Sequence, residues 1–151
     1  MDFIKVEKSN INILYDLNFQ LAIDENQKSL FTASRSSYSN AFLGNNPISF
    51  GFLGFIGKKP VGFYIFCFKF ASYIGSKVLY IEDVYIDEEF RTSDNTTMIL
   101  NHAIRQSKLE NCARIEMRVL KSFNIGYDII KQFEFNQIKK WDVYRFEQDC
   151  K

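Results

Sequence analysis

Three apolar runs rich in aromatic residues follow one another in the middle of this 151-residue chain, at positions 49–56, 61–70 and 77–86. Each run has the length of a single β-strand. The first two are joined by Gly-Lys-Lys-Pro at 57–60, which favours a hairpin, and Gly-Ser at 75–76 precedes the third. The pattern therefore predicts a three-stranded meander at the centre of the fold.

After residue 91 the apolar residues change to the spacing of a helix, which predicts a helix over about 94–109 and then a strand over 113–120. Antiparallel strands followed by a β-α-β unit predict an α+β fold with a mixed, mostly antiparallel sheet flanked by helices. The remaining elements expected are a strand at 3–6, a helix at 11–21 capped by Ser9 or Asn10, a weaker helix at 34–42, a short helix at 122–133 capped by Ser122, and strands at 135–138 and 141–146.

The composition is that of a soluble globular domain, and we expect one domain over residues 1–151. Nineteen basic and eighteen acidic residues leave a formal charge of +1, which argues against nucleic acid as a partner. Residues 1–20 hold no apolar core of a signal peptide, and Lys58, Lys59 and Pro60 interrupt the most apolar stretch, residues 48–68. We therefore expect a cytoplasmic protein without a membrane partner.

The cysteine and histidine residues form no recognisable reactive motif. Cys67, Cys112 and Cys150 lie far apart without a CxxC pair, so reduced thiols are favoured over a disulfide framework or a metal site. His102 falls on the predicted central helix without a serine or cysteine partner, which favours a surface or packing role. The aromatic stripe at 63–70 is more typical of a sheet core than of a base-stacking surface.

One pair of acidic residues, Glu82 and Asp83, interrupts the third apolar run. A carboxylate inside an apolar strand is costly to bury, so the pair indicates either a functional site or an edge position in solvent or a salt bridge. Adjacent side chains of a strand point to opposite faces, and we therefore expect only one of them to point into a given cleft.

Residues 73–91, Tyr-Ile-Gly-Ser-Lys-Val-Leu-Tyr-Ile-Glu-Asp-Val-Tyr-Ile-Asp-Glu-Glu-Phe-Arg, resemble the run that ends the meander in the GNAT superfamily of acyl-CoA N-acyltransferases. The similarity is greatest to the spermidine/spermine N-acetyltransferase branch, whose hairpin also resembles residues 57–63. Element order and length match over nearly the whole chain, and residue-level similarity is good over 60–91. The resemblance implies the GNAT fold.

The resemblance also implies an acyltransferase that moves an acetyl group from acetyl-CoA to a primary amine of a small molecule. That molecule would resemble a diamine or polyamine, or else an amino acid. Glu82 matches the family's base, acting through water, and Asp83 and Tyr73 are the expected substrate-binding residues. The residues expected to bind acetyl-CoA are Val84, Tyr85, Ile86, Arg91, Thr92, Ser93, Asp94, Asn95, Thr96 and Asn124.

The chain departs from the family pattern at three places. Asp94 and Thr96 occupy the two glycine positions of the pyrophosphate loop, so we expect weakened affinity for CoA. Ile130 occupies the position of the tyrosine that protonates the departing thiolate, and Tyr127, one helical turn earlier, is the expected catalytic substitute. Residues 70–73 supply no acidic residue for a polyamine. These departures leave open a catalytically inactive member that acts as a binding or scaffolding module.

The last predicted strand, residues 141–146, carries apolar side chains on both faces, more than one sheet face needs. Such a surface is typical of an interface, and relatives form dimers through these strands. The sequence therefore predicts a homodimer.

Overall fold

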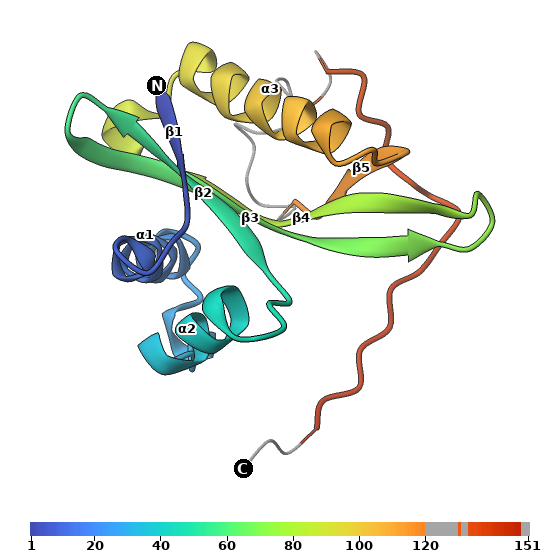
Figure 1. Ribbon diagram of the computed structural model, residues 1–151, viewed down its shortest axis with the longest axis horizontal. Helices are drawn as coiled ribbons and strands as arrows, with labels where there is room; N and C mark the ends of the chain where they lie inside the picture. Colours follow the sequence, from blue (N-terminus) through green and yellow to red (C-terminus); the bar gives the residue numbers. More distant parts are fainter. Residues whose placement is uncertain (120–129, 131–132, 149–151) are drawn as a thin grey trace. The chain divides into compact units, whose positions relative to one another are not determined.

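The computed structural model describes residues 1–119, 130 and 133–148. The chain divides into two units, Met1–Val119 and Leu120–Lys151, and each is described by itself. The first unit contains every strand and the three long helices of the described residues (Figure 1).

The first unit is built on a five-stranded sheet in the order β1-β2-β3-β4-β5. Neighbouring strands are antiparallel except β4 and β5, which are parallel. This confirms the central meander and the mixed, mostly antiparallel sheet. The strands are β1 (Asp2–Lys5), β2 (Phe50–Ile56), β3 (Lys59–Ala71), β4 (Ser76–Ile86) and β5 (Arg114–Met117).

Helices cover both faces of this sheet. Figure 1 shows α1 (Ile11–Asp24) and α2 (Arg35–Leu43) on one face and α3 (Ser93–Leu109) on the other. Short 3-10 turns lie at Lys28–Leu30 and Glu88–Phe90. Asn10 is the N-cap residue of α1, and Ser34 caps α2 in a reciprocal capping box with Ser37.

The α1 face carries an apolar core in which α1 packs on β2 and β3. Alternate residues of each strand point to this face, as the period of two requires. The buried members of the cluster are Val6, Ile11, Leu14, Leu21, Leu53, Phe63, Ile65 and Tyr85.

The α3 face is organised around His102. Its ring stacks on Phe3 at 4.2 Å between centroids, meets Phe52 edge-on at 4.7 Å, and shares a 2.8 Å hydrogen bond with the hydroxyl of Tyr64. Burial lowers the pKa of His102, which favours the neutral ring in this apolar setting. The expected packing role of His102 is confirmed.

The C-terminal strand predictions are wrong. β5 ends at Met117 rather than residue 120, and residues 133–148 contain no strand. The large apolar side chains of this segment are 58–95% exposed, namely Ile138, Trp141, Val143, Tyr144 and Phe146. Alternation of side chains describes only the two faces of a strand, whereas a strand also needs a neighbouring backbone for its hydrogen bonds.

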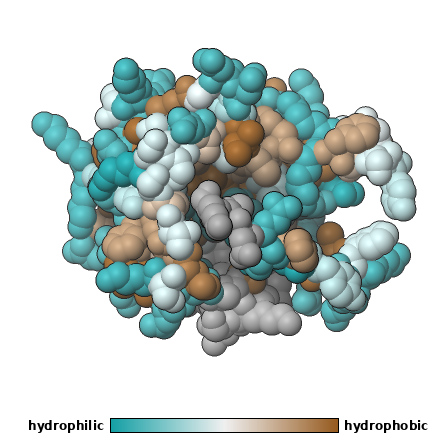
Figure 2. Space-filling model, turned by 90° about the horizontal axis from the view of Figure 1, so that it is seen from below, coloured by the Kyte–Doolittle hydropathy of each residue, from teal (hydrophilic) through white to brown (hydrophobic). Residues whose placement is uncertain are grey.

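No described helix has both the length and the apolar character needed to cross a bilayer, and no described group of His, Cys, Asp and Glu could hold a metal ion. Cys67 and Cys112 are free thiols, while Cys150 lies outside the described residues. Figure 2 shows hydrophobic residues interspersed among hydrophilic ones on the face seen from below.

Candidate active site

The sheet opens into a fork between β4 and β5. The two strands pair only where residues 78–81 lie beside residues 114–117, after which β5 ends and β4 continues to Ile86. At the mouth of the fork β4 contains a bulge: Ile65 faces Asp83 and Phe66 faces Ile81, so Glu82 is an extra residue. Bulges of this kind re-aim side chains and often lie beside active sites.

Beyond the bulge, part of the β4 backbone faces the open side of the fork. The N–H of Asp87 donates to the carbonyl of Val61 at 2.8 Å, which makes Gly62 and Ile86 a non-hydrogen-bonded antiparallel pair. The backbone groups of Ile86, and by alternation those of Val84, therefore point away from β3. The carbonyl of Ile86 accepts a 3.0 Å hydrogen bond from Nε of Arg91.

Glu82 forms an ion pair with Arg118, the first residue after β5. The two side chains are 40% and 53% exposed, so the pair lies at the surface of the fork. Exposed pairs of this kind contribute only about 0–1 kcal/mol to stability. Glu82 thus forms the salt bridge that the sequence left open as an alternative to a functional role. This ion pair is not needed to hold the fold together.

Asp83 lies deeper than Glu82, against α1. Its carboxylate accepts a 3.2 Å hydrogen bond from Nδ2 of Asn18, a buried residue of α1. Burial raises the pKa of Asp83, against the opposing effects of this hydrogen bond and of the Arg118 charge. The bulge breaks the alternation on which the expected separation of Glu82 and Asp83 onto opposite faces rested. Glu82 pairs with Arg118, whereas Asp83 bonds to Asn18 and is influenced by the Arg118 charge.

A third carboxylate completes this charged group. Glu25, which follows α1, has its pKa raised by burial and by the charge of Asp83, while Arg118 lowers it. Glu25 and Asp83 are therefore electrostatically coupled to Arg118, which pairs directly with Glu82. We name Glu25, Glu82, Asp83 and Arg118 the fork cluster. An excess of negative charge suits a ligand that carries an ammonium group.

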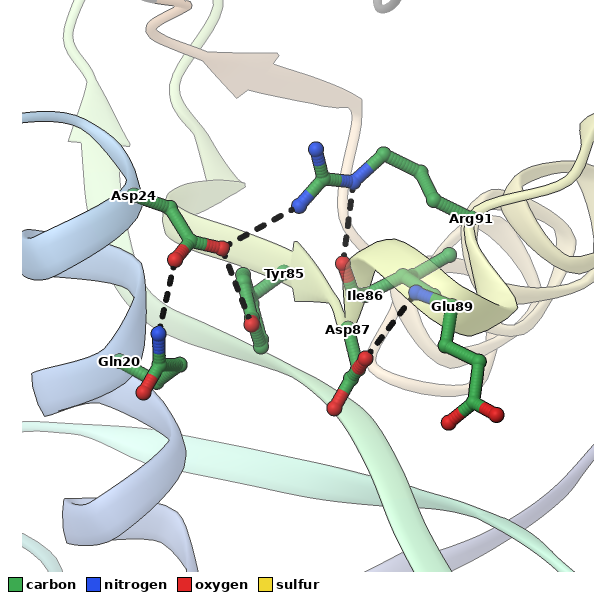
Figure 3. A network of polar contacts seen from close by, with 7 residues as sticks. All are labelled: Gln20, Asp24, Tyr85, Ile86, Asp87, Glu89 and Arg91. Carbon is green, nitrogen blue, oxygen red and sulfur yellow. Dashed lines mark hydrogen bonds and ion pairs between the residues drawn. The ribbon is translucent and has the colours of Figure 1, made fainter.

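A second polar network ties α1 to the end of β4 (Figure 3). Oδ2 of Asp24 accepts hydrogen bonds from the hydroxyl of Tyr85 at 3.1 Å and from Nη2 of Arg91 at 3.5 Å. Its Oδ1 accepts from Nε2 of Gln20 at 2.8 Å. Since Arg91 also holds the carbonyl of Ile86, Asp24 positions the segment that leads from β4 into α3.

We expect Asp24→Ala to lower the free energy of unfolding by about 1–3 kcal/mol, because it leaves the hydroxyl of buried Tyr85 and the guanidinium of Arg91 without this acceptor. The control is Asp16→Ala, which removes an exposed ion pair with Arg35 and should cost at most about 1 kcal/mol. Urea unfolding measures both. Equal losses in the two variants would show that the network does not anchor this segment.

The segment at the start of α3 adopts an ordinary helical N-terminus. Thr92 is the N-cap, and its Oγ1 accepts a hydrogen bond from the N–H of Asn95 at 3.2 Å. No residue from 91 to 96 has a positive φ, so the two absent glycines are not required by the backbone conformation here. The N–H groups of Ser93 and Asp94 have no acceptor among the described residues, which leaves two donors for an anion, beside the Asp94 carboxylate.

These donors fit a phosphate group in part. Two free N–H groups at a helix N-terminus attract an anion, whereas the side chain of Asp94 adds a negative charge at the same turn. We therefore expect this turn to bind a phosphate group more weakly than a helix N-terminus without an acidic residue.

The structure brings some predicted site residues together and leaves others apart. Glu82, Asp83 and Val84 lie at the fork, and Tyr85 packs in the α1-face core. Tyr73 is 91% exposed in the turn between β3 and β4. It precedes the bulge residue Glu82 by nine positions along the hairpin, and the structure does not bring the two together. Tyr127 and Asn124 lie outside the described residues.

Sequence reasoning missed Arg118, Asn18 and Asp24. Asn18 had a usable signal, since it is a polar residue between Leu14 and Leu21 on the apolar side of α1. Arg118 had no such signal, because its role depends on where β5 ends.

A shallow pocket of about 260 Å³ lies elsewhere, at the corner between β1, α2 and β2. It contains no member of the fork cluster.

The fold is of the mixed α+β class, with a mostly antiparallel sheet between helices. Residues 13–126 match the Acetyltransferase (GNAT) family, and the chain belongs to this family. The predicted resemblance and fold class are confirmed.

A curated relative is Thialysine N-epsilon-acetyltransferase of Caenorhabditis elegans, 25% identical over 100 residues, which are 64% of this chain and 62% of that protein. The match thus spans less than two thirds of the relative's length.

Solved structures share the fold at low identity. A probable acetyltransferase matches with a TM-score of 0.79 at 15% identity over the whole of both chains. An aminoglycoside acetyltransferase from an uncultured soil metagenomic sample, in complex with sisomicin, has a TM-score of 0.81 at 10% identity, covering 98% of this chain and 96% of that one. A predicted acetyltransferase with acetyl-CoA from Clostridium acetobutylicum has a TM-score of 0.74 at 16% identity, covering 95% of each chain.

Proposed function

We propose that the protein is an acetyl-CoA-dependent N-acetyltransferase whose acceptor is a primary amine of a small molecule. The observation that carries the proposal is the carboxylate pair Glu82 and Asp83 at the bulge, where β4 and β5 separate. A primary amine is protonated near neutral pH and must lose a proton before it can attack a carbonyl carbon. A carboxylate beside the amine can take that proton.

Each carboxylate has its own role in this proposal. Asp83 attracts the ammonium group of the acceptor, and Glu82 removes its proton through a water molecule. Acetyl-CoA supplies the acetyl thioester, whose carbon–sulfur bond breaks as the carbon–nitrogen bond forms. The nitrogen loses two protons in becoming an amide: Glu82 passes one to solvent, and the other balances the proton that Tyr127 gives to the departing sulfur.

The backbone and the start of α3 are proposed to hold the cosubstrate. The outward-facing backbone groups of Val84 and Ile86 flank the acyl chain, and the N–H groups of Ser93 and Asp94 face the phosphates. The residues completing this proposed site are Tyr85, Arg91, Thr92, Asn95, Thr96 and Asn124. A cytoplasmic location remains part of the proposal.

The test is release of CoA thiol from acetyl-CoA in the presence of single amines: diamines, polyamines, aminoglycosides, lysine and thialysine. We expect release with at least one amine, together with a higher melting temperature when CoA is added. At about 100 times its Kd, CoA should stabilise the protein by about 2.7 kcal/mol. A raised melting temperature without thiol release on any amine would favour the alternative, an inactive binding module.

We further propose a homodimer, supported by the exposed apolar residues near the C-terminus. Trp141, Val143, Tyr144 and Phe146 are 67–95% exposed, and such side chains are usually covered in an assembly. We expect sedimentation to give a dimer at micromolar concentration and Val143→Asp with Phe146→Asp to give a monomer. A monomeric unmodified protein would contradict the proposal.

A further inference from the structure

The guanidinium of Arg118 stands among carboxylates at the place where the acceptor amine is proposed to bind. The ion pair with Glu82 is its one polar contact among the described residues, and its side chain is 53% exposed. A guanidinium group has five N–H donors in a planar fork and can hold two carboxylates at once. Arg118 can therefore keep Glu82 in position and still bind a further carboxylate from solvent.

The fork cluster as a whole carries both signs of charge. Glu25, Glu82 and Asp83 favour ammonium groups, whereas Arg118 repels them and attracts an anion. A simple diamine has two cationic ends and gains nothing from Arg118. An amine that also carries a carboxylate can satisfy both kinds of group in one binding event.

The position of Arg118 in the fold supports a role in binding rather than in stability. It follows β5 directly, at the point where the chain leaves the sheet. Its neighbours on the strand form a separate network, in which Glu116 accepts from Lys69 at 3.1 Å and from Arg114 at 2.8 Å. Glu116 has its pKa lowered by these cations, so its charge is satisfied without Arg118.

We propose that Arg118 is a specificity-determining residue that recognises a carboxylate on the acceptor, so that the preferred substrates are amino-acid-like amines rather than simple diamines or polyamines. This inference rests on the proposed function and deepens it. The carboxylate of the acceptor binds the solvent-facing donors of Arg118 while Glu82 stays on its other side. The amine is thereby directed toward Asp83 and Glu82.

The test compares lysine with cadaverine, which differ only by the carboxylate. We expect kcat/KM for lysine to exceed that for cadaverine by about 10–100-fold, the discrimination of a charged hydrogen bond, and lysine methyl ester to behave like cadaverine. Arg118→Gln should bring the ratio of the two kcat/KM values close to one, and Arg118→Lys should give an intermediate ratio. The ratio cancels any effect of the unpaired Glu82 on the chemical step.

Arg114→Gln is the matched control, because it removes the same charge at the other end of β5 without touching Glu82. It should leave the ratio as in the unmodified protein. A preference for cadaverine, or a ratio unaffected by Arg118→Gln, would overturn the inference even if acetylation is observed.

Calorimetric titration of the protein with lysine and with cadaverine separates this inference from the proposed function. If no amine is acetylated, the proposed function fails, and the titration then decides the inference alone. Tighter binding of lysine that is lost in Arg118→Gln supports it, and equal binding of both amines overturns it.

Discussion

Replacing Glu82 with glutamine is expected to lower turnover by about 10²–10⁴-fold, the usual contribution of a positioned general base. The substitution keeps the shape of the side chain and removes its ability to accept a proton. The ion pair with Arg118 is lost as well, but because both partners are largely exposed this costs at most about 1 kcal/mol of stability. Affinity for CoA should be nearly unchanged.

The measurement is the rate of thiol release at saturating acetyl-CoA and amine. Glu116→Gln is the control, since Glu116 is also an ion-paired glutamate but lies outside the fork. It should retain the turnover of the unmodified protein. A Glu82→Gln variant that is as active as this control would remove Glu82 from the catalytic role.

Replacing Asp94 and Thr96 together by glycine is expected to tighten CoA binding about tenfold, equivalent to about 1.4 kcal/mol. The double replacement removes a negative charge from the first turn of α3 and opens space beside the free N–H groups of Ser93 and Asp94. Because the backbone here is helical with negative φ, each glycine should also cost about 1 kcal/mol of stability.

Titration calorimetry with CoA measures the affinity, and Asp94→Asn separates charge from space. If charge dominates, Asp94→Asn alone should give most of the gain. Looser binding in the double variant would contradict this account of the loop.

The sequence predicted the elements of the first unit well because period and turn residues agree along that region. The three central runs become β2, β3 and β4, and the change of period after Arg91 becomes α3. Apolar alternation over residues 135–146 predicted strands that the structure does not contain. Side-chain alternation carries no information about which backbone is available as a partner.

The candidate site could be predicted only in part. Carboxylates are costly to bury in an apolar strand, and this singled out Glu82 and Asp83. The structure has its β4 bulge at this position. Their relative direction was not predictable, because a single bulge residue reverses the alternation on which that prediction rested. Arg118 was not predictable either, since its partner depends on where β5 ends and β4 continues.

We propose that the protein acetylates an amine at the fork between β4 and β5. The most direct test of this claim is mass spectrometry of the amine after incubation with acetyl-CoA and either the unmodified protein or Glu82→Gln. We predict one added acetyl group per acceptor molecule with the unmodified protein, at a rate at least about 10²-fold above that of Glu82→Gln. No acetylated product above the Glu82→Gln background, with any amine tested, would contradict the claim.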